Sequence, residues 1–335
     1  MYKKILFDIT PTVLINLLII NMFSVSVVFS QEKSKKDPVN IDGVKANYAH
    51  QSYGDHKRNK FDLWLANSEN PTPLVIYIHG GGFVGGDKSN YYNKKDLVNF
   101  LNNGVSVATI NYRFLYMKPF GILSSLNDSK KFLQFVRFNH KKFNIDKNKV
   151  GVYGASAGAG TSLWLAFSDE MSEPLSEDPI ARESTRISCV GALATQATYD
   201  FFQWKNILEA PEYEINLKSM KRISRAFGLK YDKNRNLENE IEIRENLDFL
   251  AKMDVSDPPM FVFNNMKGGF PEDNGHREHH PLHAKALKLK ADEVGISSVV
   301  YAPKIGIVDP DETRLVEFFL KFLDKNWFTL DDKFF

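Results

Sequence analysis

The chain has 335 residues, and its 43 Lys and Arg against 41 Asp and Glu give a formal net charge of +2. Hydrophobic residues make up 43% of it, which is enough for a large core and excludes a globally disordered chain. Because the charge is nearly balanced and no basic run alternates with aromatic residues, nucleic acid is not expected as a partner. The length allows one large or two medium domains.

The N-terminus has the pattern of a secretory signal peptide. Two lysines precede an apolar stretch at 12–29, and the chain turns polar from Gln31. We expect a signal peptide over 1–30 and a flexible leader over 31–45, so that the mature chain is secreted or periplasmic. No stable membrane insertion is expected after cleavage, although an uncleaved apolar stretch of this length would anchor the chain in a membrane.

Strand-like and helix-like segments alternate along the rest of the chain. Such alternation is typical of a mostly parallel central sheet with helices on both faces, and we predict this α/β class for 46–335. The predicted strands, in chain order, are 60–66, 73–78, 105–114, a strand from about 149, 187–195, 259–264 and 297–302. The predicted helices are 125–140, one that ends at about 167, 281–294 and 311–323.

Residues 201–255 interrupt this alternation. The segment is rich in Lys, Arg, Asn and Glu. Ile215, Met220, Ile223 and Phe227 mark an amphipathic helix within it. We expect a helical insertion here.

Two glycine-rich motifs each follow a predicted strand. The sequence G-A-S-A-G at 154–158 fits the G-x-S-x-G nucleophile elbow, in which a strained turn exposes the serine, here Ser156. The sequence H-G-G-G-F at 79–83 fits a loop whose backbone N–H groups bind an oxyanion. Gly81, Gly82 and Ala157 are the predicted oxyanion donors. Either motif alone could be an ordinary glycine-rich turn, but the pair in this order predicts an α/β-hydrolase fold.

These residues resemble the α/β-hydrolase carboxylesterase and lipase superfamily, in particular its H-G-G-G branch. The resemblance runs from about 60 to 323 and includes V-S-V-A-T-I-N-Y-R-F at 105–114. Finer detail, such as H-H-P at 279–281, is similar to a subset of exported bacterial esterase-like proteins. The resemblance implies an ester hydrolase with a serine nucleophile, which reacts through an acyl-enzyme. We expect a small-molecule or carbohydrate ester as the substrate, and no cofactor or metal. The resemblance also implies that the insertion at about 201–255 caps the site, the alternative being a surface excursion.

The remaining catalytic groups are missing from their usual places in this superfamily. The acid normally follows the penultimate strand, but 264–269 reads N-N-M-K-G-G and holds no carboxylate. The base normally follows the last strand, but 302–307 holds no histidine, and no histidine follows His283. A serine needs a general base, and the base needs an orienting group. The triad therefore has to be completed from elsewhere.

A histidine cluster lies after the predicted penultimate strand. We predict that His280, or next His279, is a relocated general base. Asp309, after the last strand, would orient it by an exchange of acid and base positions; Asp273 and Glu272 are lower-ranked alternatives. The histidine cluster consists of His276, His279, His280 and His283, and the carboxylates considered as the acid are Glu272, Asp273, Asp309 and Asp311.

Several other interpretations stay open at this point. His279 and His283 have the i, i+4 spacing of a metal site, and His280 could merely cap a helix that begins at Pro281. His79 is expected to brace the oxyanion loop. The chain could also be a hydrolase-fold binding protein that has lost catalysis, or an amide hydrolase, and its oligomeric state is not indicated.

Overall fold

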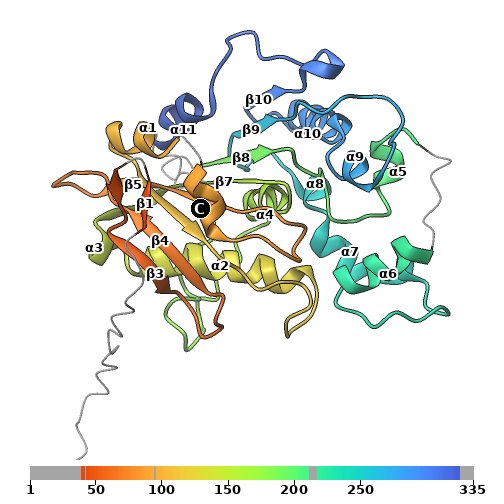
Figure 1. The fold of residues 1–335 in the computed structure, drawn as a ribbon, viewed down its shortest axis with the longest axis horizontal. Helices are drawn as coiled ribbons and strands as arrows, with labels where there is room; N and C mark the ends of the chain where they lie inside the picture. Colours follow the sequence, from red (N-terminus) through yellow and green to blue (C-terminus); the bar gives the residue numbers. More distant parts are fainter. Residues whose placement is uncertain (1–38, 42, 94–95, 211–216, 325–335) are drawn as a thin grey trace, which may run out of the picture. The chain divides into compact units, whose positions relative to one another are not determined.

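The computed structural model describes residues 39–41, 43–93, 96–210 and 217–324, drawn in colour in Figure 1. The predicted signal peptide over 1–30 lies outside these ranges, as does most of the leader. None of the described helices has the length and apolar character needed to cross a bilayer.

An eight-stranded sheet forms the centre of the described chain, in the order β10-β9-β8-β7-β5-β6-β4-β3. Six neighbouring strands from β10 to β6 are parallel, and β4 pairs antiparallel with both β6 and β3. This confirms the predicted mostly parallel sheet. The strands are β3 (Tyr48–Ser52), β4 (Lys60–Trp64), β5 (Thr72–Ile78), β6 (Ser106–Ile110), β7 (Ile145–Ala155), β8 (Cys189–Leu193), β9 (Met260–Phe263) and β10 (Ser298–Tyr301); β1 (Asn40–Ile41) and β2 (Val44–Lys45) form a separate pair.

Helices cover both faces of this sheet (Figure 1). Along β5, Leu74, Ile76 and Ile78 belong to one buried cluster, whereas Val75 and Tyr77 belong to another, because successive side chains point to opposite faces. The first cluster includes residues of α2, α4 and α10, and the second includes residues of α1 and α11. These helices are α1 (Asp96–Asn102), α2 (Ile122–Phe138), α4 (Ala157–Phe167), α10 (Pro281–Val294) and α11 (Leu315–Leu323); the short α3 (His140–Phe143) precedes β7.

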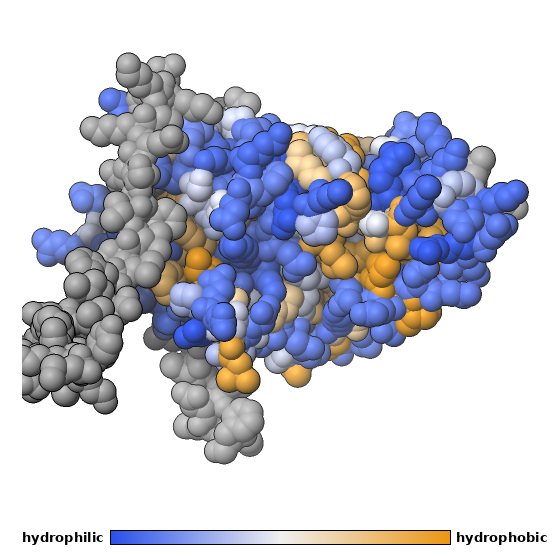
Figure 2. All heavy atoms as spheres, turned by 90° about the horizontal axis from the view of Figure 1, so that it is seen from below, coloured by the Kyte–Doolittle hydropathy of each residue, from blue (hydrophilic) through white to orange (hydrophobic). Residues whose placement is uncertain are grey.

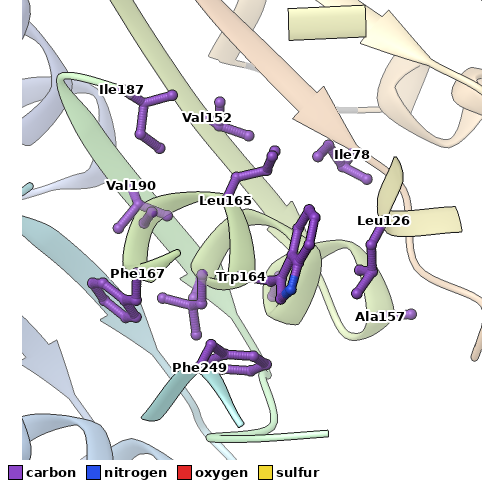
Figure 3. Close-up of a cluster of buried hydrophobic side chains, with 14 of the residues drawn as sticks. Ile78, Leu126, Val152, Ala157, Trp164, Leu165, Phe167, Ile187, Val190 and Phe249 are labelled. Carbon is purple, nitrogen blue, oxygen red and sulfur yellow. The ribbon is translucent and has the colours of Figure 1, made fainter. Parts of the chain in front are cut away.

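Helix α4, which follows the serine, is buried along its whole length. Figure 3 shows Leu165 of this helix beside Val152 and Ile187, with Phe249 on the other side of the helix. Trp164 is buried with them, and its indole N–H donates to the carbonyl of Asn246 at 3.0 Å. A helix buried on all sides is held rigidly, so the turn at its N-terminus is held rigidly as well.

Some predicted boundaries are wrong by a few residues. The strand predicted over 105–114 ends at Ile110, and beyond it the side chains of Asn111 and Tyr112 bond to the segment that follows β5. The helix predicted over 311–323 begins at Leu315, since residues 309–314 form a turn closed by Asp309. Such shifts are usual where side-chain hydrogen bonds compete with regular backbone pairing.

The segment at 201–255 forms short helices on one side of the sheet. They are α5 (Trp204–Ile207), α6 (Leu217–Ala226), α7 (Ile241–Leu247) and α8 (Phe249–Lys252), with the short 3-10 helix η3 (Leu237–Asn239) between α6 and α7. Of the residues that mark the predicted amphipathic helix, Ile223 and Phe227 are buried and Met220 is partly buried. Ile215 lies outside the described residues.

Candidate active site

Ser156 lies at a strained turn between β7 and α4. Its φ and ψ are 54° and −120°, an unfavourable region for any residue other than glycine. A Cβ atom on Gly158 would lie 2.0 Å from the carbonyl oxygen of Ile78, so only glycine lets α4 approach β5 this closely. The N–H of Ser156 donates to the carbonyl of Leu193 at 2.9 Å. The hydrogen bond to the end of β8 and the close approach that glycine allows together hold the serine in place.

The structure brings His279 to this serine. Ser156 Oγ and His279 Nε2 are 2.8 Å apart, and His279 Nδ1 lies 2.9 Å from the carbonyl oxygen of Gly275. A carbonyl only accepts, so Nδ1 carries the ring proton and donates it to Gly275. Nε2 is then the acceptor for the Ser156 hydroxyl. This is the tautomer that a general base needs.

The prediction that His280 would be the base is not supported by this geometry. His280 is the N-cap of α10: its Nδ1 accepts from the Leu282 N–H at 3.2 Å. Its Nε2 lies 2.8 Å from the carbonyl oxygen of Gly269. Both ring nitrogens of this buried side chain are therefore used locally. The neighbouring residue, the second-ranked His279, occupies the position next to the serine.

The carboxylates predicted to orient the base make other contacts. Asp309 accepts from the Thr313 N–H at 3.1 Å, and Asp273 is the N-cap of the short helix α9 (Asn274–Glu278), accepting from the His276 N–H. Glu272 pairs with Lys267 at 2.6 Å on the surface. Among the described residues, no carboxylate oxygen lies within 4.0 Å of a His279 ring nitrogen. The orienting acceptor is thus a backbone carbonyl.

The other two histidines of the cluster are buried in separate places. His276 Nε2 lies 2.8 Å from the carbonyl oxygen of Lys267. His283 accepts from the Ala197 N–H through Nδ1, and burial lowers its pKa to about 3. The four rings thus face different partners, and the described residues hold no group of three or more side chains placed to bind a metal.

Two buried amide side chains that sequence reasoning missed hold the peptide groups around His279. Asn264, the first residue after β9, donates through Nδ2 to the carbonyl of His279 at 2.8 Å. Gln196, which follows β8, donates through Nε2 to the carbonyl of Glu278 at 2.6 Å. The ends of two neighbouring strands therefore determine where the base lies. Only the position of Asn264 directly after a strand could have indicated its role.

Two glycines of the loop after β5 line the cavity beside the serine. Gly81 and Gly82 have φ angles of 114° and 58°, and both line the same cavity as Ser156 and Ala157. A Cβ atom on Gly81 would lie 2.3 Å from the carbonyl oxygen of Gly85. Ala157 begins α4, and the first N–H groups of a helix have no partner within it. The three residues predicted as oxyanion donors are therefore brought together.

His79 lies under this loop. Its Nδ1 is 2.6 Å from the carbonyl oxygen of Gly80, and its ring stacks on Tyr112 with centroids 4.4 Å apart. The Tyr112 hydroxyl donates to the His79 carbonyl at 2.8 Å, and Arg58 reaches His79 Nε2 at 3.5 Å. Burial lowers the pKa of His79 to about 4, so the ring is neutral at pH 7. Arg58 and Tyr112 are supports that sequence reasoning missed.

A cavity of about 1070 Å³ opens above Ser156. Phe83, Leu115, Ile122 and Tyr199 supply apolar lining, and residues of α5, α6 and α9 also line the cavity. Trp204 belongs to this lining, whereas Trp164 does not. Figure 2 shows apolar surface bordered by hydrophilic surface on the side where α6 and α7 lie. The segment predicted to cap the site therefore contributes directly to the walls of the cavity.

Comparison with known proteins identifies related sequences and structures. The family model BD-FAE matches residues 61–268. Gut esterase 1 of Caenorhabditis elegans is 33% identical over 103 residues, which cover 29% of this chain and 18% of that protein. A probable isoprenylcysteine alpha-carbonyl methylesterase of Arabidopsis thaliana is 29% identical over 127 residues, covering 37% and 29%. The chain thus spans less than a third of the length of these relatives.

Solved structures are similar over more of the chain. A truncated carbohydrate esterase from gut microbiota has a TM-score of 0.59 at 15% identity, covering 83% of this chain and 96% of that one. Esterase B from Lactobacillus rhamnosis, in an inhibited form, has a TM-score of 0.58 at 16% identity, covering 89% and 92%. At these identities the likeness establishes the fold, and the predicted α/β-hydrolase fold is confirmed.

Proposed function

The chain belongs to the BD-FAE family, and we propose that it is a serine-dependent carboxylic ester hydrolase whose base comes from an unusual position. The observation that carries the proposal is the contact of 2.8 Å between Ser156 Oγ and His279 Nε2. A base must lie within hydrogen-bond reach of the proton that it removes. The esterases among the chain's relatives and structural neighbours support the same reaction class.

The first half of the proposed reaction forms an acyl-enzyme. His279 Nε2 takes the hydroxyl proton while Ser156 Oγ attacks the ester carbonyl. The N–H groups of Gly81, Gly82 and Ala157 bind the negative charge that develops on the carbonyl oxygen. When the tetrahedral intermediate collapses, the carbon–oxygen bond to the alcohol breaks. Protonated His279 gives its proton to the leaving alcohol, and the acyl group stays on the serine.

Water completes the cycle. His279, neutral again, removes a proton from a water molecule as its oxygen attacks the acyl carbonyl. Collapse of the second intermediate releases the carboxylic acid, and His279 returns the proton to Ser156 Oγ. The Gly275 carbonyl dipole stabilises the protonated ring through Nδ1–H. No cofactor enters these steps.

We further propose where the protein acts and on which class of substrate. The N-terminal pattern at 1–30 supports export to the cell exterior or periplasm, and two structural neighbours are a carbohydrate esterase and an acetyl ester-xyloside bifunctional hydrolase. A small-molecule or carbohydrate ester outside the cytoplasm is therefore the proposed substrate. Expression of the full chain followed by cell fractionation and mass measurement checks the location. A cytoplasmic chain that retains its first 30 residues would contradict export.

One observation favours a second candidate, a binding protein of this fold without catalysis. Among the described residues no carboxylate orients His279, and a carbonyl dipole stabilises a protonated ring less than a full charge does. In that case the cavity would bind an ester without cleaving it.

The decisive experiment compares the mature chain with Ser156→Ala and His279→Ala on para-nitrophenyl acetate and butyrate. We expect turnover by the parent chain, loss of at least about 10³-fold in both variants, and labelling of Ser156 by a serine-directed phosphonate. Ser162→Ala is a matched control, because its hydroxyl is buried in α4 and bonds to the Gly158 carbonyl. Absence of both turnover and labelling in a folded parent chain would support the binding protein instead.

A further inference from the structure

The cavity above Ser156 has a strongly asymmetric charge. Its lining contains six cationic residues and one acidic residue, Glu278, which pairs with Arg222. The chain as a whole has 43 cationic against 41 acidic residues, so this excess is local. We call the six residues the cationic rim: Lys205, Lys218, Lys221, Arg222, Arg225 and Arg277.

Four members of the cationic rim lie on one side of α6. Lys218, Lys221, Arg222 and Arg225 have the spacing i, i+3, i+4 and i+7, which places them along one stripe of a helix. Ile223 and Ala226 on the adjacent side of α6 are buried and also line the cavity. The stripe therefore borders the cavity.

This arrangement is unfavourable for α6 itself. Like charges three and four residues apart repel each other, and Lys218 lies in the first turn, where the helix dipole favours an anion. Helix α10 shows the opposite pattern, since Lys288 pairs with Asp292 at 2.8 Å and Lys290 with Glu293 at 3.0 Å. Among the described residues, no carboxylate lies within 4.0 Å of the cationic groups of Lys205, Lys218 or Arg225. Because these positive charges destabilise α6, we infer that they serve a function other than the stability of the helix.

We propose that the ester substrate of this protein carries a carboxylate, which the cationic rim binds while the ester group lies at Ser156. The inference rests on the ester-hydrolase function proposed above. Positive charge on one wall of a low-dielectric cavity raises the local concentration of an anionic substrate and speeds its association. The apolar lining next to the oxyanion loop receives the uncharged part, with Phe83 and Leu115 on that side.

The test uses pairs of esters that differ in one charge. In the first pair, para-acetoxybenzoate and its methyl ester place the carboxylate on the alcohol part. In the second, the para-nitrophenyl monoester of glutaric acid and para-nitrophenyl pentanoate place it on the acyl part. Each rate is corrected for uncatalysed hydrolysis. The full chain, including Glu212 and Glu214 of the segment outside the described residues, is used throughout.

We expect kcat/KM for the anionic member of one pair to exceed that of its neutral partner by about 10-fold or more at low ionic strength. The pair that shows the preference identifies the part of the substrate that lies under α6. Because salt shortens the range of electrostatic attraction to about 3 Å at about 1 M, the preference falls steeply there. Equal rates for both members of both pairs would overturn the inference, yet would leave the ester-hydrolase function standing.

Variants of α6 test whether the cationic rim causes the preference for anionic esters. In Lys218→Gln with Arg225→Gln, the ratio of anionic to neutral kcat/KM should fall by about 3-fold or more, and in the double Glu variant it should fall below one. Glutamine is a good helix former and relieves the repulsion within α6, so the variant is expected to fold. The matched control is Lys141→Gln with Lys304→Gln, which removes the same charge from exposed sites outside the cavity. A control that lowers the ratio as much as the α6 variant would contradict binding by the cationic rim.

Discussion

The segment that carries Ser156 and the segment that carries His279 are held by different means. The serine follows a central parallel strand and precedes a fully buried helix, with glycines where any side chain would collide with backbone. The histidine lies in the connection between β9 and α10, held by hydrogen bonds from Asn264 and Gln196 to peptide carbonyls. Close packing fixes the nucleophile, and a few hydrogen bonds fix the base. The first arrangement tolerates almost no added volume, and the second depends on individual polar contacts.

The largest effect, a loss of activity, is expected from replacing His279 but not from replacing His280. His279→Ala should lower kcat/KM by about 10³-fold or more, because general acid–base catalysis is lost. His280→Ala should leave kcat/KM within about 3-fold and lower the free energy of unfolding by roughly 1 kcal/mol, because α10 loses its N-cap. Ester turnover and urea unfolding of both variants check this. A greater catalytic loss in His280→Ala would restore His280 as the base.

Glycine substitutions test the difference in packing. Gly158→Ala should destabilise the protein by about 3 kcal/mol or more, since the added Cβ would lie 2.0 Å from the Ile78 carbonyl oxygen. Gly275→Ala should change the stability by no more than about 1 kcal/mol, since its Cβ meets only Asp273 Oδ1 at 3.3 Å. Thermal and urea unfolding measure both. If both variants lose the same free energy of unfolding, the two segments do not differ in how tightly they are packed.

Two buried, neutral histidines near the site make the protein sensitive to acid: His79 in the loop after β5 and His283 in α10. Burial lowers the pKa of His79 to about 4 and that of His283 to about 3. The unfolded chain binds protons at these residues below about pH 6.5, whereas the folded chain does not, so acid favours unfolding. Above that pH the protonation of these two residues adds no pH dependence to the stability.

As the pH falls from about 6.5 toward 4, each histidine should lower the free energy of unfolding by up to about 1.4 kcal/mol per pH unit. Urea unfolding at several pH values measures the slope. His79→Gln and His283→Gln should each reduce it. A slope that is the same in all three proteins would contradict the two lowered pKa values.

The smallest effect is expected from a variant that loosens the position of the base. Asn264→Ala removes the hydrogen bond to the His279 carbonyl and should lower kcat by about 10-fold with little change in KM. Gln134→Ala is a matched control, because Gln134 is a buried amide that donates to the Ala181 and Glu183 carbonyls. Both variants should lose about 1–3 kcal/mol of stability. If the control loses as much kcat, Asn264 acts only through stability.

Much of the segment around Ser156 could be predicted from sequence because its determinants are local. The strand, the glycines and the serine follow one another within a few residues, and the strained turn needs that pattern. The base could not be chosen in the same way, since four histidines lie within eight positions. Which histidine faces the serine depends on contacts between distant residues, such as that between Gln196 and Glu278, 82 residues apart.

One local signal did favour the observed arrangement. Pro281 occupies the first turn of α10, which makes His280 the N-cap and turns its ring back to the helix N–H groups. His279, one residue earlier, is then free to face the serine. The cationic rim has a similar origin: the charges of α6 are visible in the sequence, but their place in the cavity depends on the packing of 201–255 against the sheet.

The Gly275 carbonyl that orients His279 lies only four residues away, at the start of the same short helix. A base that is oriented within its own helical turn is self-contained, so neither the last strand nor the loop after it is required for proton transfer. The connection after β10 is therefore free to vary in length and sequence without cost to the chemistry. For engineering, residues 264–283 supply both a base and its orienting carbonyl, but their placement beside a serine elbow also needs the hydrogen bond from Gln196.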